Sequence, residues 1–366
     1  MSSRPAVADD PAKILVFAYM GLGDAFMFQP TFRALLSRYP QAKVSIISGV
    51  RSPVIEVLRR TAGSLGRELD AVYEANYKEL SPAERRSLNS LIVMEGYDMV
   101  VCTYMTPVPY FTRAISASPI RVGHTIPEKW YKPRPNAIFN ISIALEQDKT
   151  HETERHARLA IALGIEVTDR SSALPLDDAE LSFAEEFWRE HQLHDARVIG
   201  THFGASKIQN WKRWNDEGFD ETLSRIADEN SSVLLFGLEE ERDGILASSR
   251  TARSQTIDLI GKLSIFQVAA LLAKCDIMLA NDSGLGHVAI AVGIPAVRVF
   301  GMSDYWGYRS LQFPQRDVWI GIECSPCLQL GYLKPYNVHN CGHRNCMNLV
   351  TPEMVTETFR AAAKKK

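Results

Sequence analysis

The sequence predicts an α/β protein. It should have two Rossmann-like parallel-sheet domains that face each other across a cleft, followed by a C-terminal cysteine knot. Short apolar runs alternate with helical patterns along both halves of the chain, as they do in parallel sheets covered by helices. At 366 residues the chain is too long for one ordinary core and fits two domains. Four of the six cysteines lie after residue 320.

The composition is that of a globular protein and excludes several other classes. Hydrophobic residues make up 46% of the chain and charged residues 23%. The net charge of −2 gives no reason to expect a nucleic-acid partner. No apolar run reaches the roughly 18 residues that a membrane span needs, and the polar N terminus has no apolar signal core. We therefore expect a cytoplasmic protein.

Residues 1–170 are predicted to form the first domain. It begins with an apolar strand at residues 13–17, a turn at 20–24 and a helix at 25–38. Further strands and helices are expected in alternation at residues 44–47, 53–62, 71–73, 82–94 and 99–102. Residues 119–139 mix aromatic, proline and basic residues and predict a long irregular loop, which could bind an anionic acceptor or serve packing or an oligomer contact.

Residues 171–320 are predicted to form the second domain, after a helix at 152–163 and a linker at 165–178. The alternation then repeats. Strands are expected at residues 198–201, 233–236, around 257, 277–280 and 296–300. Helices are expected at residues 216–228, 265–273 and 288–292. The third segment, residues 321–366, combines the cysteine cluster with a terminal helix.

The turn Asn281–His287 is the most informative motif, because it joins a predicted strand to a predicted helix. Ligands of open α/β sheets bind at the carboxyl ends of the strands. Gly284 and Gly286 let the backbone approach a ligand, and the helix N terminus favours an anion. The turn therefore suits a phosphate or diphosphate. The alternative is a plain connection in which Asp282 or Ser283 caps the helix.

The C-terminal cysteines have a spacing that suits a metal. In a reducing compartment such a cluster indicates a tetrathiolate zinc or iron site better than disulfides. His339 and His343 could replace one of the sulfurs. Unliganded or disulfide-bonded thiols remain the alternative, and a catalytic metal is not expected because four sulfurs leave no open position. The four residues are Cys324, Cys327, Cys341 and Cys346.

Four segments match one known family in their order along the chain: Gly21–Asp24, Thr201–Trp214, Asn281–His287 and the cysteine cluster. With them the chain resembles glycosyltransferase family 9, the heptosyltransferases that extend the inner core of lipopolysaccharide, which have the two-domain GT-B fold. The resemblance implies an acceptor-binding first domain and a second domain that binds a nucleotide sugar, most simply ADP-heptose. It also implies an inverting, metal-independent reaction without a catalytic cofactor. The absence of any Asp-x-Asp triplet agrees with this.

For catalysis, the resemblance assigns Asp24 as the general base. A sugar hydroxyl is a poor nucleophile near neutral pH, and a carboxylate can take its proton as the new bond forms. The alternative for Asp24 is a helix-capping role. Lys212 is implied to stabilise the departing diphosphate, with Arg213 as the other candidate cation. The hydroxyls of Thr201 and Ser206 could add hydrogen bonds to phosphate.

The remaining site residues come from the same resemblance. Asp282 should bind the hydroxyls of the donor sugar, while His287 could donate to phosphate or be structural. Glu240 or Glu241 should lie near the ribose, or could merely complement a helix dipole. Backbone amides for the donor are expected from Ser283, Gly284 and Leu285. The residues implied near the acceptor are Gly23, His151 and Arg155.

Other functions remain as alternatives. A nicotinamide oxidoreductase would also use a Rossmann sheet, but Phe26 stands where the third glycine of its fingerprint should be. A nucleotide-sugar epimerase shares the two-domain architecture. A protein O-heptosyltransferase would use another acceptor, and a non-catalytic scaffold could be built on the cysteines. The family resemblance implies a lipid-linked or protein glycan acceptor, and at most a peripheral contact with the inner face of the inner membrane.

Overall fold

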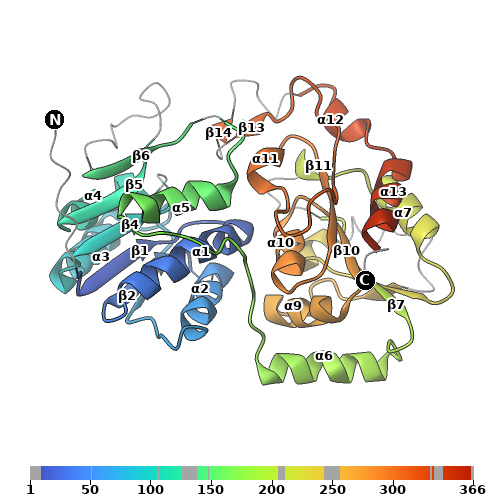
Figure 1. The fold of residues 1–366 in the computed structure, drawn as a ribbon, viewed down its shortest axis with the longest axis horizontal. Helices are drawn as coiled ribbons and strands as arrows, with labels where there is room; N and C mark the ends of the chain where they lie inside the picture. The colour runs from blue at the N-terminus through green and yellow to red at the C-terminus, as the bar shows by residue number, and fades with distance from the viewer. Residues whose placement is uncertain are drawn as a thin grey trace. The chain divides into compact units, whose positions relative to one another are not determined.

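The computed structural model describes residues 10–50, 52–104, 107–125, 138–146, 148–204, 211–242, 256–329, 332–333 and 341–363. The chain divides into two compact units, Met1–Ser172 and Ala173–Lys366 (Figure 1). Each unit contains one six-stranded parallel sheet with its own helices. The prediction of an α/β protein with two Rossmann-like sheets is therefore confirmed.

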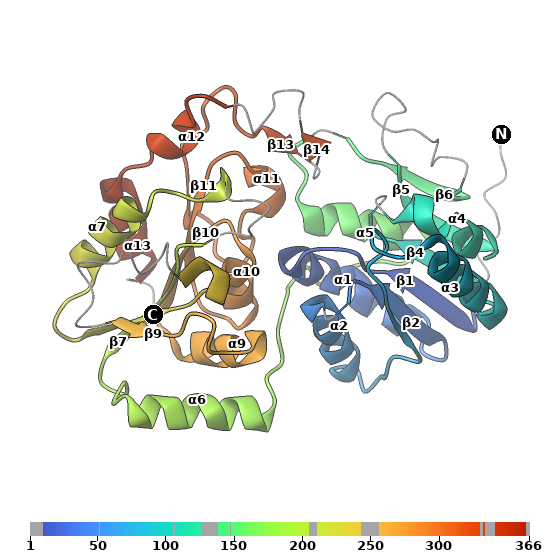
Figure 2. The same ribbon diagram turned by 180° about the vertical axis from the view of Figure 1, so that it is seen from behind.

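The sheet of the first unit has the strand order β3-β2-β1-β4-β5-β6. Its strands are β1 Lys13–Phe17, β2 Lys43–Ser48, β3 Val72–Glu74, β4 Met99–Cys102, β5 Ile120–Thr125 and β6 Ile141–Ala144. Its helices are α1 Leu22–Arg38, α2 Pro53–Gly63, α3 Pro82–Glu95, α4 Val108–Ser116 and α5 Glu152–Ala162. Helices α1, α2 and α5 pack together on one face, and α3 and α4 pack together on the other (Figures 1 and 2).

The structure corrects the predicted loop at residues 119–139. Residues 120–125 form the buried strand β5, which pairs with β4 and β6. The apolar residues Ile120 and Val122 alternate with Arg121, which is a strand pattern, but the prolines and aromatic residues that follow obscured it. The basic aromatic stretch 126–137 lies outside the described residues.

The sheet of the second unit has the order β12-β11-β10-β7-β8-β9. Its strands are β7 Arg197–His202, β8 Ser231–Leu235, β9 Thr256–Asp258, β10 Ile277–Asn281, β11 Ala296–Phe300 and β12 Asp317–Trp319. Two further short strands, β13 Leu328–Gln329 and β14 Tyr332–Leu333, pair antiparallel. Its helices are α6 Asp178–Glu190, α7 Asp216–Ile226, the 3-10 helix η4 Glu239–Glu241, α9 Ile265–Lys274, α10 Gly284–Ala291, α11 Tyr305–Tyr308, α12 Asn345–Asn348 and α13 Pro352–Ala363.

Both sheets have a point where the strand order reverses, and such points are where open α/β sheets bind ligands. In the first unit the reversal lies between β1 and β4, and in the second it lies between β10 and β7. The segments that follow these four strands are therefore the first places to look for a site. They contain Asp24, Tyr104 and Asp282, and His202 is the last residue of β7.

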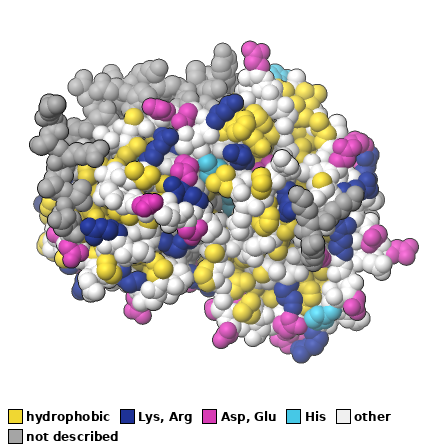
Figure 3. All heavy atoms as spheres, in the orientation of Figure 1, with side chains coloured by type: hydrophobic (Ala, Val, Ile, Leu, Met, Phe, Trp, Pro, Cys, Tyr) yellow, Lys and Arg dark blue, Asp and Glu magenta, His cyan; other side chains and the backbone are white. Residues whose placement is uncertain are grey.

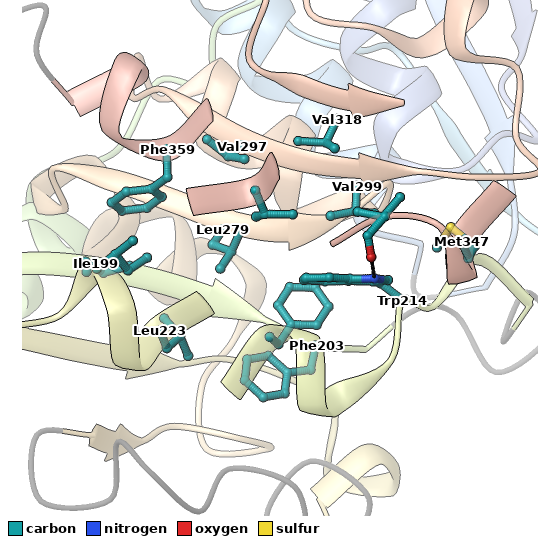
Figure 4. Packing of buried hydrophobic residues seen from close by; sticks show 14 of the residues in the cluster. Ile199, Phe203, Trp214, Leu223, Leu279, Val297, Val299, Val318, Met347 and Phe359 are labelled. Carbon is teal, nitrogen blue, oxygen red and sulfur yellow. Dashed lines mark hydrogen bonds between the residues drawn. The ribbon is translucent and has the colours of Figure 1, made fainter. Parts of the chain in front are cut away.

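The core of the second unit is organised around Trp214, whose side chain is almost fully buried (Figure 4). Its ring packs edge-on against Phe219, which stacks on Phe203. The indole Nε1 donates a hydrogen bond to the backbone oxygen of Val350 at 3.1 Å, just before α13. A buried tryptophan generally needs such a partner for its N–H. This contact joins the segment before α7 to the residues just before the C-terminal helix α13.

Within the described residues, no helix is both long and apolar enough to cross a membrane. On the face drawn in Figure 3, basic, acidic and hydrophobic side chains are interspersed, as the small net charge of −2 suggests.

Candidate active site

The site in the second unit is built on the neighbouring strands β7 and β10. Their carboxyl ends lie side by side, with Ala280 opposite His202 in the register. The fully buried side chain of Asn281 fixes the segments that leave the sheet here. Its Oδ1 accepts a hydrogen bond from the Trp214 amide at 2.8 Å, and its Nδ2 donates to the Phe203 oxygen at 2.7 Å. The residues beside Trp214 are thereby held next to the end of β10.

Lys212 and Asp282 form an ion pair at this position. The Lys212 Nζ lies 2.9 Å from the Asp282 Oδ2, and the two side chains are 13% and 3% exposed. Burial alone would raise the pKa of Asp282, but the charge of Lys212, with contributions from His287 and Arg298, holds that pKa well below its usual value. Asp282 is therefore an anion, and the fold brings together two predicted residues that lie 70 positions apart.

A buried arginine, Arg298, is linked to this ion pair through His287. Arg298 in β11 is fully buried and forms two hydrogen bonds with Asp317, at 2.9 and 3.0 Å. Its Nη1 lies 3.2 Å from the Nε2 of His287, which in turn is 3.9 Å from the Asp282 Oδ1. A side chain at Gly286 would come within 2.7 Å of the Arg298 Cδ, so the glycine makes room for the arginine. His287 is thus tied to the protein interior as well as to Asp282.

The start of α10 behaves differently from a plain capped turn. Ser283 is the N-cap residue, yet within the described part of the chain its side chain makes no capping hydrogen bond. Gly284 and Leu285 form the first turn of the helix, where backbone amides favour an anion. The hydroxyl of Thr201 is fully buried and donates to the Leu279 oxygen, so it holds β7 to β10. Ser206 lies outside the described residues.

The acidic segment after β8 contributes Glu241. Its Oε2 lies 3.2 Å from the Nε2 of His202 and accepts a hydrogen bond from the Leu238 amide at 2.8 Å. Glu240 is exposed to solvent. The structure therefore directs Glu241, of the two predicted glutamates, toward the ends of the strands.

In the first unit, Asp24 lies in the first turn of α1. Its Oδ2 accepts a hydrogen bond from the Gly21 amide at 3.2 Å, and its Oδ1 accepts one from the Tyr104 hydroxyl at 3.0 Å. The helix-capping alternative is therefore present, but it uses only one of the two carboxylate oxygens. Gly23 follows Gly21 in the same turn and is partly exposed. Tyr104 in turn packs edge-on against the buried His156.

His151 and Arg155 lie inside the first unit. His151 is the N-cap residue of α5, and its Nδ1 accepts a hydrogen bond from the Thr153 amide at 3.2 Å. The Arg155 side chain is 1% exposed and forms ion pairs with Glu152 and Asp148. Both residues stabilise the start of α5, and the Arg155 guanidinium is directed into the protein.

All six cysteines fall within the described residues and none of them forms a disulfide there, so the disulfide alternative is not observed. Cys327 and Cys346 are buried, Cys341 is partly exposed and Cys324 is exposed. Burial, together with the nearby thiols of Cys327, Cys341 and Cys324, raises the pKa of Cys346 to about 11. The four thiols are therefore neighbours. Among the described side chains, however, no three Cys, His, Asp or Glu residues are placed to hold a metal ion.

Sequence reasoning missed three residues that contact the predicted site. Tyr104 follows β4 and reaches Asp24 only because β1 and β4 are neighbours. His202 contacts both Ser283 and Glu241. Arg298 is a charged residue in the middle of the apolar run 296–300, and a lone charge in a central strand is the one signal that could have indicated it.

Comparison with known proteins gives the family. Residues 116–336, more than half of the chain, match the family model for glycosyltransferase family 9 (heptosyltransferase). Lipopolysaccharide heptosyltransferase 2 from Escherichia coli K12 is 27% identical over 314 residues, which cover 80% of this chain and 83% of that protein.

Solved structures agree in fold. A family 9 glycosyltransferase from Veillonella parvula has a TM-score of 0.70 at 19% identity, covering 98% of this chain and 99% of its own. The E. coli ADP-heptose lipopolysaccharide heptosyltransferase II has a TM-score of 0.67 at 23% identity, covering 96% and 98%. An iron-containing dodecameric glycosyltransferase from enterotoxigenic E. coli has a TM-score of 0.56 at 13% identity, covering 97% and 76%. This chain therefore belongs to glycosyltransferase family 9, the heptosyltransferases, and is a glycosyltransferase.

Proposed function

We propose that this glycosyltransferase transfers a heptose from ADP-heptose to a hydroxyl group of a lipopolysaccharide-core acceptor, at the cytoplasmic face of the inner membrane. The observation that carries the proposal is the buried Lys212–Asp282 pair, which lies beside the start of α10 at the switch point of the second sheet. The relatives named above as heptosyltransferases support the choice of sugar and acceptor.

The second unit would bind the donor. The diphosphate would occupy the N terminus of α10, near the amides of Ser283, Gly284 and Leu285, with His287 one turn into the helix. Lys212 would turn from Asp282 to the diphosphate and stabilise the charge that grows as the leaving group departs. Asp282, released from the lysine, would accept hydrogen bonds from the sugar hydroxyls. Glu241 would bind the ribose.

The first unit would activate the acceptor. The Asp24 carboxylate would take the proton of the acceptor hydroxyl while its oxygen forms a bond to the anomeric carbon and the bond to the diphosphate breaks. Because this is one displacement, the anomeric centre inverts. Tyr104 and Gly21 would hold the carboxylate in place through the hydrogen bonds described above. Gly23 would contact the acceptor.

His151 and Arg155 would contribute to acceptor binding indirectly, by holding the start of α5. The leaving group would need no divalent metal, because Lys212 and the helix terminus supply positive charge. The neighbouring thiols of the C-terminal segment have the donor chemistry of a structural zinc or iron site. We propose that they gather around one such ion, which would hold this segment together and take no part in the reaction.

The proposal is tested by calorimetry with a panel of ADP-, GDP- and UDP-sugars, followed by transfer assays. ADP-heptose should bind most tightly. Asp24→Asn should bind it as the wild type does but lose a factor of about 10² to 10⁴ in transfer rate, the usual contribution of a general base. Asp70→Asn, which removes a surface carboxylate paired with Lys43 in the same unit, is the matched control and should change neither quantity.

Three outcomes would contradict the proposal at different levels. A clear preference for a UDP-hexose would exclude heptose as the sugar but leave glycosyl transfer in place. Isomerisation of the donor without any acceptor would indicate an epimerase. Failure to bind every nucleotide sugar would exclude the donor site itself.

A further inference from the structure

His202 lies between Ser283 and Glu241, which are proposed to bind opposite ends of the donor nucleotide, the diphosphate and the ribose. Its Nδ1 is 3.3 Å from the Ser283 Oγ, and its Nε2 is 3.2 Å from the Glu241 Oε2. His202 ends β7, while Ser283 and Glu241 lie in the segments that follow β10 and β8, and these strands are neighbours in the sheet in the order β10-β7-β8. The side chains of His202 and Glu241 are only 8% and 11% exposed. One imidazole therefore links the start of α10 to the segment after β8.

The chemistry of the three groups fixes the direction of the two hydrogen bonds. A carboxylate can only accept, and a neutral imidazole has one N–H and one acceptor nitrogen. Burial alone would raise the pKa of Glu241, but the hydrogen bonds from His202 and from the Leu238 amide outweigh it and lower that pKa. The Nε2 of His202 therefore carries the proton that Glu241 accepts. The Nδ1 is left to accept the hydroxyl hydrogen of Ser283.

The backbone around this link leaves space for it. A side-chain carbon at Gly204 would lie 2.1 Å from the Glu241 Oε1 and 2.6 Å from the His202 Nε2, closer than such atoms can approach. Position 204 must therefore be glycine for the carboxylate and the imidazole to meet. Gly204, in the loop that follows β7, thus provides the space in which the two side chains meet.

We propose that His202 is a positioning residue of the donor site, which fixes the distance between the group that meets the diphosphate, Ser283, and the group that meets the ribose, Glu241. This inference rests on the proposed function of the site. A nucleoside diphosphate can engage both ends at once, and a link that is already formed lowers the entropic cost of binding it. His202 should therefore act on the affinity for the nucleotide and not on the chemical step.

Two substitutions of His202 each keep one of its two hydrogen bonds and remove the other. In His202→Asn the amide oxygen takes the place of the accepting Nδ1 and retains the contact with Ser283, whereas in His202→Gln the amide nitrogen takes the place of the donating Nε2 and retains the contact with Glu241. Each should raise the dissociation constant of ADP and the KM of the donor about tenfold, a loss within the range of a single hydrogen bond. The kcat should stay within about twofold of the wild type. His194→Gln, at an exposed position of the same unit, is the control.

The Glu241→Gln variant shows whether the effect passes through Glu241. In the double variant, His202→Asn should cost less than it does in the wild type, because Glu241→Gln has already weakened the contact that His202→Asn removes. Nitrogen-15 NMR of the ligand-free wild type tests the same link and does not depend on whether any variant folds. It should show the His202 tautomer that carries hydrogen on Nε2.

The possible results are distinct. If the wild type binds ADP and both His202 variants bind it equally well, the inference is wrong while the proposed function stands. A loss in kcat at unchanged ADP affinity, or a ligand-free tautomer with hydrogen on Nδ1, would also overturn it. If the wild type binds none of ADP, GDP and UDP, the proposed function and this inference fail together.

Discussion

Replacing Lys212 with methionine tests the central ion pair of the second unit, because methionine keeps most of the length of the side chain and removes the charge. The Asp282 carboxylate would then remain 3% exposed without its nearest cation. Two unit charges about 4 Å apart attract by about 4 kcal/mol at an effective dielectric constant of about 20. Removing one partner of a buried pair costs about 3 to 5 kcal/mol. We expect the free energy of unfolding at pH 7 to fall by about 4 kcal/mol.

The loss should depend on pH in a defined direction. In the wild type the pKa of Asp282 is held below its unfolded value of about 3.9. The carboxylate therefore stabilises the fold above that pH, and this contribution is lost as the pH falls through the folded pKa. Without Lys212 the pKa of Asp282 rises, so the variant takes up a proton at a less acidic pH than the wild type. The difference in stability between the two should shrink as the pH is lowered from 7 toward 4.

Urea unfolding followed by tryptophan fluorescence is a suitable assay, because five of the six tryptophans lie in the second unit. The matched control is the double variant Lys212→Met/Asp282→Asn, which leaves no lone buried charge and should recover most of the lost stability. Both variants should lose glycosyl transfer. The reasoning is refuted if Lys212→Met unfolds at the same urea concentration as the wild type, or if the double variant is no more stable than the single one.

Three further predictions concern other parts of the molecule. Tyr104→Phe removes the donor to Asp24 and should lower kcat about tenfold at an unchanged donor KM, measured by initial rates; an equal change in both constants would contradict the positioning role. Gly204→Ala should weaken ADP binding in calorimetry, since its methyl group overlaps the neighbouring carboxylate and imidazole, whereas Gly63→Ala, which meets nothing within 4 Å, should not. Elemental analysis should find one zinc or iron per chain in the wild type and none in Cys346→Ser; a metal-free wild type would rule out the tetrathiolate.

Most of the strands and helices could be predicted from local sequence patterns. The run 277–280 and the turn after it predicted β10 and the start of α10, because an apolar strand followed by a glycine-rich turn has few other solutions. The same reasoning located β7 and β8. It failed where flanking prolines and aromatic residues obscured a strand, as at β5. It also did not predict α6, whose capping box at Asp177 and Glu180 lies at the end of the expected linker.

The site was harder to predict because its contacts join residues far apart in sequence. Nothing near Asp24 indicates that Tyr104 will reach it, since that contact depends on which strand lies beside β1. Similarly, His202 meets Glu241 only because β7 and β8 are adjacent. Family resemblance indicated Lys212 and Asp282 separately. Their pairing is a property of the folded sheet and could not be read from either segment alone.

The side chain of Asn281 has a consequence for how this enzyme can change during evolution. It holds the backbone at Phe203 and Gly204 on one side of the 205–210 segment and at Trp214 on the other. Insertions or deletions within residues 205–210 would leave both anchors in place, and Lys212 would stay two residues before the anchor at Trp214. Relatives could therefore vary the length of this segment freely, whereas replacement of the single asparagine would release both anchors at once.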